Sequence, residues 1–328
     1  MESGVLVNMK RFFIIATSVL LLLVIAFSIF IFTFNVNRYK AVLITKLEES
    51  MGRDVRIDNI SISVNLLRGV GLEAKGVAIK DRGKAWSDFL LKADRFNVNL
   101  EILPLLKKDI QVKKLFIPIL EINAGSGSNS PVFKCAVDMN VHILINSSPE
   151  ENMLKTLSAK GNAKLTNAVL DKMNVLKTAL DQLNMLPNLV QKLKNNLPEK
   201  YSALLYQNYT AFKPINADFE IRDGSIYFDK ILVESEAFYL VNKGSVGMID
   251  QSLKISSNFF IPKDLSVAFS GVVPELELIA DKDGLITMPL EIRGKIPNVS
   301  IMPDLNYVLQ KLIASKGQEL LNKLFKIK

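Results

Sequence analysis

The feature that most constrains the fold of this chain is a long run in which apolar and polar side chains alternate, from Val132 to Ile145. Its apolar positions are Phe133, Cys135, Val137, Met139, Val141, Ile143 and Ile145, and its polar positions include Lys134, Asp138, Asn140 and His142. Successive side chains of a β-strand point to opposite faces, so the apolar set shares one face. Alternation of this length predicts a half-buried strand of an antiparallel sheet.

Similar patterns recur on both sides of this run and predict a mostly β protein of the α+β class. Before it, strands are expected at Asp54–Val64, with a change of face near Asn59, and at Leu72–Lys80, Phe89–Leu100 and Val112–Ile122. After it, they are expected at Ile215–Arg222, Ser225–Val233, Phe238–Ile249, Leu253–Ile261 and Met288–Arg293. Asp223-Gly224 predicts a tight hairpin turn between the first two of these later strands.

Three segments have helical spacing instead. Arg38–Met51 predicts a short helix that ends at Gly52. Leu165–Tyr209 predicts a central helical segment, broken by Pro187 and Pro198, with an apolar stripe at Val169, Met173, Leu176, Leu180 and Leu183. Such a stripe usually packs on a core, and a membrane-lying or partner-binding helix is the alternative. An amphipathic helix is expected after Pro303-Asp304, with Leu305, Val308, Leu309, Leu312 and Ile313 on its apolar face.

The uncharged run from Phe12 to Phe34 predicts a transmembrane helix. At about 1.5 Å per residue it is long enough to cross a hydrocarbon core of roughly 30 Å. It is too long for a cleaved signal peptide and lacks a suitable cleavage site, so we expect an uncleaved signal anchor. Basic residues stand on both sides of the run, so the positive-inside rule leaves its orientation open.

Composition and rare residues restrict the chemistry. The chain is 49% hydrophobic and 23% charged, which excludes a disordered protein. Its formal net charge of +8 fits an anionic membrane surface or ordinary surface lysines, and the scattered charges do not predict nucleic-acid binding. The one cysteine, Cys135, and the one histidine, His142, fall on opposite faces of the same strand. We therefore expect no catalytic residues, no metal site, no cofactor and no enzymatic activity.

The order of these pieces resembles the AsmA family of bacterial inner-membrane proteins. The first similar element is Met51-Gly52-Arg53-Asp54-Val55-Arg56-Ile57, directly after the anchor and short helix. The second runs from Phe96 through Leu103-Pro104-Leu105-Leu106 to Val112, and the third is Met288-Pro289-Leu290-Glu291-Ile292-Arg293-Gly294. The chain is about half as long as many members, so it resembles a short member of the family.

The resemblance implies a single-pass inner-membrane protein with its body in the periplasm. It implies a curled, largely antiparallel sheet that forms a groove, because related proteins resemble chorein-type bridges whose apolar groove holds lipid acyl chains. The expected organisation is a cytoplasmic N-terminus (1–11), a transmembrane anchor (12–34), an N-terminal β region (38–124), a C-terminal β region (131–302) with a helical insert (165–210), and an amphipathic helix (303–328). Roughly a dozen strands at about 4.8 Å would extend about 60 Å, too short to bridge two membranes.

The function implied is lipid binding or lipid handling in the biogenesis or homeostasis of the cell envelope and its outer membrane. The partners implied are membrane phospholipids and other envelope proteins, with no nucleic acid. The candidate groove residues are Phe133, Val137, Met139, Val141, Ile143, Ile215, Phe219 and Ile221. An envelope scaffold or assembly factor without lipid cargo is the alternative.

Overall fold

A single large antiparallel sheet dominates the computed structural model, which describes residues 40–65, 69–101, 112–123, 130–145, 155, 157–183, 186–295 and 298–311. The sheet has 14 strands, and every pairing in it is antiparallel. The strands are β1 (Asp54–Arg56), β2 (Asn59–Asn65), β3 (Gly69–Lys80), β4 (Phe89–Leu100), β5 (Val112–Asn123), β6 (Val132–Ile145), β7 (Leu157–Asp171), β8 (Thr210–Ala211), β9 (Ile215–Arg222), β10 (Ser225–Glu234), β11 (Tyr239–Gly247), β12 (Ser252–Ile261), β13 (Ile286–Lys295) and β14 (Asn298–Pro303).

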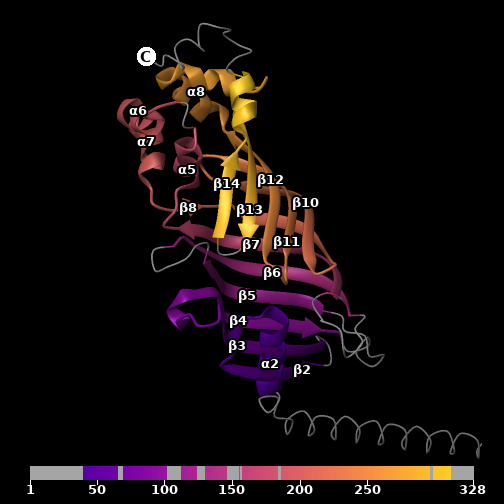
Figure 1. Ribbon diagram of the computed structural model, residues 1–328. Coiled ribbons are helices and arrows are strands. Elements are labelled where there is room, and N and C mark those ends of the chain that lie inside the picture. The colour runs from indigo at the N-terminus through magenta and orange to yellow at the C-terminus, as the bar shows by residue number, and fades with distance from the viewer. Residues whose placement is uncertain are drawn as a thin grey trace, which may run out of the picture.

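Most neighbours in the sheet are also neighbours in sequence (Figure 1). The main path runs β1-β3-β4-β5-β6-β7-β9-β10-β11-β12-β13-β14, while β2 pairs with β3 and β8 pairs with β7. The expected bounds of β4 and β6 are confirmed, and the change of face near Asn59 separates β1 from β2. Asp223 and Gly224 both have positive φ, 51° and 68°, which is the geometry that a two-residue hairpin turn requires.

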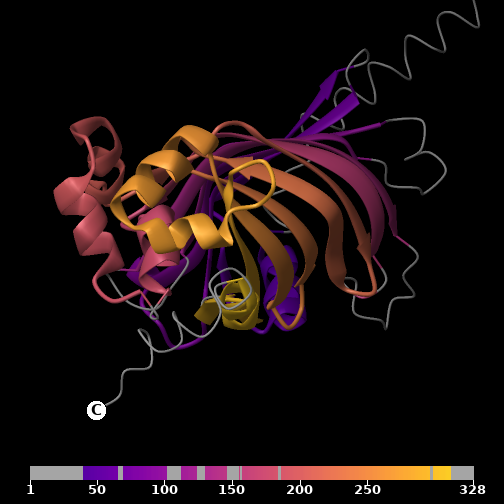
Figure 2. The same ribbon diagram turned by 90° about the horizontal axis from the view of Figure 1, so that it is seen from above.

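The sheet is strongly curved, and Figure 2 shows it arching over one side. Register shifts interrupt several of its pairings, including those of β4 with β5, β5 with β6, and β6 with β7. Bulges of this kind bend a strand and add to the right-handed twist of a sheet. The curvature therefore has a local cause in the middle strands.

The helix that precedes the sheet, α2 (Lys40–Met51), lies under the arch (Figure 2). Gly52, at φ 66°, ends the helix, and its N–H donates to the Glu48 carbonyl at 2.9 Å. Three side chains of α2, those of Ile44, Leu47 and Met51, pack against the first strands. The strand residues that they cover are Val55, Ile57, Ile60, Ala74 and Val77.

A second group of helices, which we call the helical module, gathers at one side of the later strands (Figure 2). It consists of α5 (Val175–Asp181), α6 (Leu189–Asn196), α7 (Glu199–Tyr206), α8 (Lys263–Val272), the 3-10 helix η3 (Pro274–Ile279) and a helix at 305–311. Leu193, Phe269 and Leu276 are fully buried here, in one cluster with Phe259 and Met288 of the sheet. The module and the C-terminal strands thus share one core.

One side chain, that of Asn174, ties two parts of the helical module together. Its Oδ1 accepts from the Lys177 N–H at 2.9 Å and caps α5. Its Nδ2 donates to the carbonyls of Leu204 at 2.7 Å and Gln207 at 3.0 Å, at the end of α7. The residue therefore satisfies backbone groups at two helix ends that would otherwise lack partners.

The expected start of the central helical segment at Leu165 is wrong. Residues 165–171 belong to β7, and the first helix begins at Val175. A bulge at Asn167, with φ 52°, shifts the alternation by one residue, so the period of two is lost in this part of the strand. The four-residue spacing of Val169 and Met173 in the sequence then resembles that of a helix. The breaks at Pro187 and Pro198 are confirmed, because α6 begins two residues after Pro187 and α7 begins directly after Pro198.

Two expectations concern the ends of the chain. None of the helices within the described ranges is both long and apolar enough to cross a membrane, and the predicted span Phe12–Phe34 lies outside those ranges. The closing helix is described only at 305–311, where Val308 is 1% exposed while Leu305 is 38% exposed. The remaining residues of that predicted helix also lie outside the described part.

Candidate functional site

The register of the sheet gathers apolar side chains on the face under the arch, which we call the concave face. In the middle of the sheet, Val137 of β6 lies opposite Leu165 of β7, which in turn lies opposite Ile215 of β9. The same register continues to both sides and makes one apolar surface across the sheet. Its members include Leu72, Phe96, Val98, Leu115, Ile117, Met139, Ile221, Ile226, Phe228, Leu253 and Ile255.

All the candidate groove residues fall on this face. Phe133, Val137, Met139 and Val141 come from β6, and Ile215, Phe219 and Ile221 come from β9. Ile143 occupies the same face of β6 by register, opposite Ala159, and its side chain lies outside the described part. The strand β7 separates the two groups, so the structure brings the candidates into one area through a strand that the sequence analysis left out.

The candidates differ in how far they are covered. Val137, Val141 and Ile215 are 5%, 8% and 6% exposed, so neighbouring side chains already bury them. Phe133, Met139, Phe219 and Ile221 are half-buried. These four therefore supply the accessible apolar surface.

The strand β7 contributes a row of small residues beneath these larger ones. Ala159, Gly161 and Ala163 face the concave side, and the two alanines are buried. A Cβ atom on Gly161 would lie 2.9 Å from Cζ of Phe219 and 2.5 Å from the Asn140 carbonyl oxygen. The Phe219 ring thus occupies space that only glycine leaves free. The alternation of these small residues with Lys160, Asn162 and Lys164 was the signal that could have identified the strand.

Helices cover the concave face at both ends but not in the middle, within the described residues. α2 packs on β1–β3, and the helical module packs on β12 and β13. The hydrophobic cluster between them contains Ile117, Leu120, Cys135, Val137 and Ile215, and no helix contributes to it. From β4 to β10 the described part of the apolar surface is therefore lined by sheet residues and by Phe212, which lies between β8 and β9 and packs on Phe133.

The opposite side, which we call the convex face, is polar. Cross-strand ion pairs follow it, such as Lys114 with Asp138 at 2.9 Å and Lys160 with Glu220 at 3.6 Å. Their side chains are 42–78% exposed, so each pair contributes little to stability. The contrast between the two faces shows that the sheet has one face for apolar contacts and one for water.

Chemically reactive groups are sparse on both faces. Cys135 is buried on the concave face, and burial raises the pKa of its thiol to about 11, so it stays protonated at neutral pH. His142 lies on the convex face, opposite Lys160. Within the described ranges, no three His, Cys, Asp or Glu side chains gather in a group that could hold a metal ion. The absence of enzymatic activity remains a prediction.

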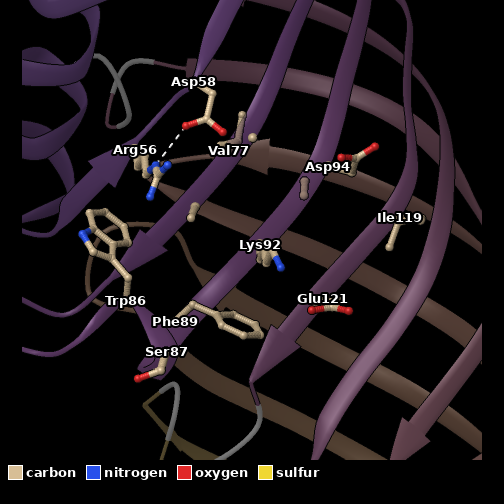
Figure 3. A pocket seen from close by; sticks show the side chains of 13 residues that line it. Arg56, Asp58, Val77, Trp86, Ser87, Phe89, Lys92, Asp94, Ile119 and Glu121 are labelled. Carbon is tan, nitrogen blue, oxygen red and sulfur yellow. Dashed lines mark hydrogen bonds and ion pairs between the residues drawn. The ribbon is translucent and has the colours of Figure 1, made fainter.

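The convex face also carries hollows that the sequence did not predict, and one of them has a volume of about 600 Å³ (Figure 3). It lies beside the 3-10 helix η2 (Trp86–Asp88), which connects β3 to β4. Charged groups of both signs surround a floor of small residues. Its lining consists of Arg56, Asp58, Gly76, Val77, Ala78, Trp86, Ser87, Phe89, Lys92, Ala93, Asp94, Ile119 and Glu121.

Comparison with known proteins supports the resemblance seen in the sequence. The model of the AsmA family matches residues 9–126, which include α2 and β1–β5 and two of the three similar elements. No curated protein and no solved structure matches the chain. Over residues 9–126, the chain is therefore similar to the AsmA family.

Proposed function

We propose that this chain is a membrane-anchored protein of the cell envelope that holds lipid acyl chains against its concave face. The observation that carries the proposal is the band of half-buried apolar side chains from β4 to β10, over which no described helix packs. Apolar surface that faces water is unfavourable, and each methylene group that is buried against it contributes about 0.8 kcal/mol to the free energy of binding. A lipid chain is an occupant that supplies many methylene groups at once.

The dimensions of this band suit such an occupant. β4, β5, β6, β7, β9 and β10 are consecutive in the sheet, and five spacings of about 4.8 Å give roughly 24 Å. One leaflet of a bilayer core is roughly 15 Å deep, which is the space that a lipid acyl chain fills. The band is therefore long enough for a complete acyl chain lying across the strands.

An envelope scaffold without lipid cargo is the second candidate function. The low exposure of Val137, Val141 and Ile215 favours it, because the curved sheet already buries part of its own apolar face. In that case the half-buried residues would serve only to pack the sheet. The two functions differ in whether lipid touches the concave face in the cell.

Site-specific photo-cross-linking of the full chain in its membrane separates the two. A benzophenone amino acid replaces either Phe219 on the concave face or Phe116, which is 37% exposed on the convex face of β5. After irradiation and denaturation, mass spectrometry should find lipid attached at position 219 and little at position 116. Equal labelling at both positions, or none at either, would contradict the lipid proposal and favour the scaffold.

The orientation of the body is part of the same proposal. With Phe12–Phe34 as the anchor, we expect the sheet to lie outside the cytoplasm, in the periplasm, as the family resemblance implies. A reporter enzyme that is active only outside the cytoplasm should be active when fused after Lys328. Activity of a cytoplasm-only reporter at the same position would overturn this orientation.

A further inference from the structure

The hollow on the convex face has an aromatic wall that is held in place and yet exposed to solvent. Trp86 is 41% exposed, and the ammonium group of Lys80 lies 4.8 Å from the centre of its ring. Lys80 is itself only 6% exposed and is paired with the Asp54 carboxylate, so it covers the inner face of the ring. The exposed part of Trp86 is therefore turned away from Lys80, toward solvent and the hollow (Figure 3).

Hydrogen-bond donors and hydrogen-bond acceptors both surround this ring. Lys92, Asp94 and Glu121 line the hollow, and none of them forms an ion pair within the described part of the chain. Lys92 and Glu121 are cross-strand neighbours in register, and Figure 3 shows the Lys92 side chain between Trp86 and Glu121. Arg56 and Asp58 complete the rim, joined by an ion pair of 2.9 Å.

The hollow exists because the residues of its floor are small. Gly76 and Ala78 leave room between the strands, and Gly76 has φ 60°, in the left-handed region. A Cβ atom at position 76 would overlap the Asp58 carboxylate. Glycine at this position therefore allows Asp58 to lie at the edge of the hollow.

The balance of charge argues against an ionic ligand. Two cations, Arg56 and Lys92, face three carboxylates, those of Asp58, Asp94 and Glu121, which leaves a net charge of −1. Excess carboxylate disfavours a phosphate or an anionic membrane surface. An ammonium ligand is also disfavoured, because Lys92 lies centrally in the hollow and Lys80 already occupies one face of the indole ring.

We propose that this hollow binds a sugar ring, as a free saccharide or as the glycan part of a larger molecule. One face of a sugar ring presents C–H groups, which pack on the negative face of an indole ring. Its hydroxyl groups lie around the edge, and each can donate to a carboxylate and accept from an ammonium group. A volume of about 600 Å³ lies within the usual range of small-molecule sites.

This inference is independent of the lipid proposal. The hollow lies on the face of the sheet opposite to the apolar band, and no candidate groove residue lines it. Failure of one proposal therefore leaves the other unchanged. The two would also be measured with different ligands.

The single tryptophan of the chain makes the test direct, because all indole emission comes from Trp86. The full chain, in a zwitterionic detergent that contains no sugar, is titrated with neutral monosaccharides and with oligosaccharides to about 100 mM, where a ligand with a Kd of about 10 mM is nearly saturating. We expect a saturable change in emission. Tighter binding of oligosaccharides than of monosaccharides would indicate a glycan, and equal binding would indicate a free sugar.

Two variants assign the response to the hollow. Lys92→Met removes a charged hydrogen-bond donor and should weaken binding about tenfold. Lys254→Met removes an exposed lysine from the convex face of β12, away from the hollow, and should leave binding unchanged. Trp86→Leu, followed by calorimetry, should abolish binding.

Three outcomes would overturn the proposal. The first is the absence of any saturable response to the sugars. The second is a response to choline chloride or to phospholipid vesicles in place of the sugars. The third is equal weakening by Lys92→Met and Lys254→Met, which would place the binding site elsewhere.

Discussion

A charge placed on the concave face tests whether that face holds lipid or only packs the sheet. Met139 is suited to this test because it is half-buried, between Leu115 of β5 and Ala163 of β7. In Met139→Asp, the new carboxylate can still reach water from a half-buried position, so the chain should fold. At the fully covered Val137, the same change would bury an unpaired charge and unfold the sheet.

The expected magnitudes follow from the burial of Met139. Burying a whole methionine side chain stabilises a protein by about 1.5–3 kcal/mol, so losing a half-buried one should cost about 0.8–1.5 kcal/mol. In a domain of 150–250 residues, 1 kcal/mol shifts Tm by about 2–4 °C, so a shift of a few degrees is expected. A carboxylate that displaces two or three lipid methylene groups removes about 2 kcal/mol of binding, which is about a thirtyfold loss of affinity.

The matched control is Asn140→Asp, which adds the same charge one residue away. Asn140 is exposed on the convex face of the same strand, where its Nδ2 donates to Asn162 at 3.3 Å. Binding of a fluorescent phospholipid analogue and Tm are measured for both variants and the unchanged chain. Lipid binding should fall in Met139→Asp and stay unchanged in Asn140→Asp.

Two results would refute this reasoning. If Met139→Asp fails to fold, the concave face is a closed core and the accessible band does not exist in solution. If Met139→Asp folds and binds lipid as well as the control does, lipid contacts some other surface. Either result would favour the scaffold function.

Three further predictions concern the stability of the helical module, the reactivity of the buried thiol and the length of the sheet. Asn174→Ala removes three backbone hydrogen bonds and should cost about 2 kcal/mol, measured by denaturant unfolding against the exposed control Asn216→Ala. Burial raises the pKa of the Cys135 thiol from 9.0 to about 11, so the thiol should resist alkylation at pH 8 in the native chain and react after unfolding. Because the pKa is higher in the folded state, the contribution of this group to stability should decline from about pH 9 to pH 11. Eleven strand spacings along the main path give roughly 53 Å, so small-angle scattering of the monomer should exclude a length near 150 Å.

The identity and faces of most strands could be predicted from the chain because the side-chain period of a strand is strictly two. β6 shows this best, since one alternating run gave both its bounds and its apolar face. The same reasoning failed at residues 165–171, where the Asn167 bulge disrupts the period and imitates a helix. The helix α8 and the strand β14 were also missed, because their apolar residues are arranged for contacts with distant parts of the chain.

The candidate site was only partly predictable for the same reason. The alternation identified Met139 and Phe219 as members of one face, but not that β7 separates their strands or that Gly161 lies against the Phe219 ring. The sugar site was invisible in the sequence. Trp86 and Glu121 are far apart in the chain, and only the pairing of β4 with β5 beside η2 brings them to one hollow.

Alternation along the chain establishes that this protein has a sheet with one apolar and one polar face, because neighbouring side chains of an extended backbone must point in opposite directions. Tertiary structure decides which part of the apolar face stays accessible. Bulges curve the sheet, α2 covers its first strands, and the helical module covers its last ones. These contacts join residues that are distant in sequence, so no local pattern contains them. Among the described residues, they leave the band from β4 to β10 without a covering helix.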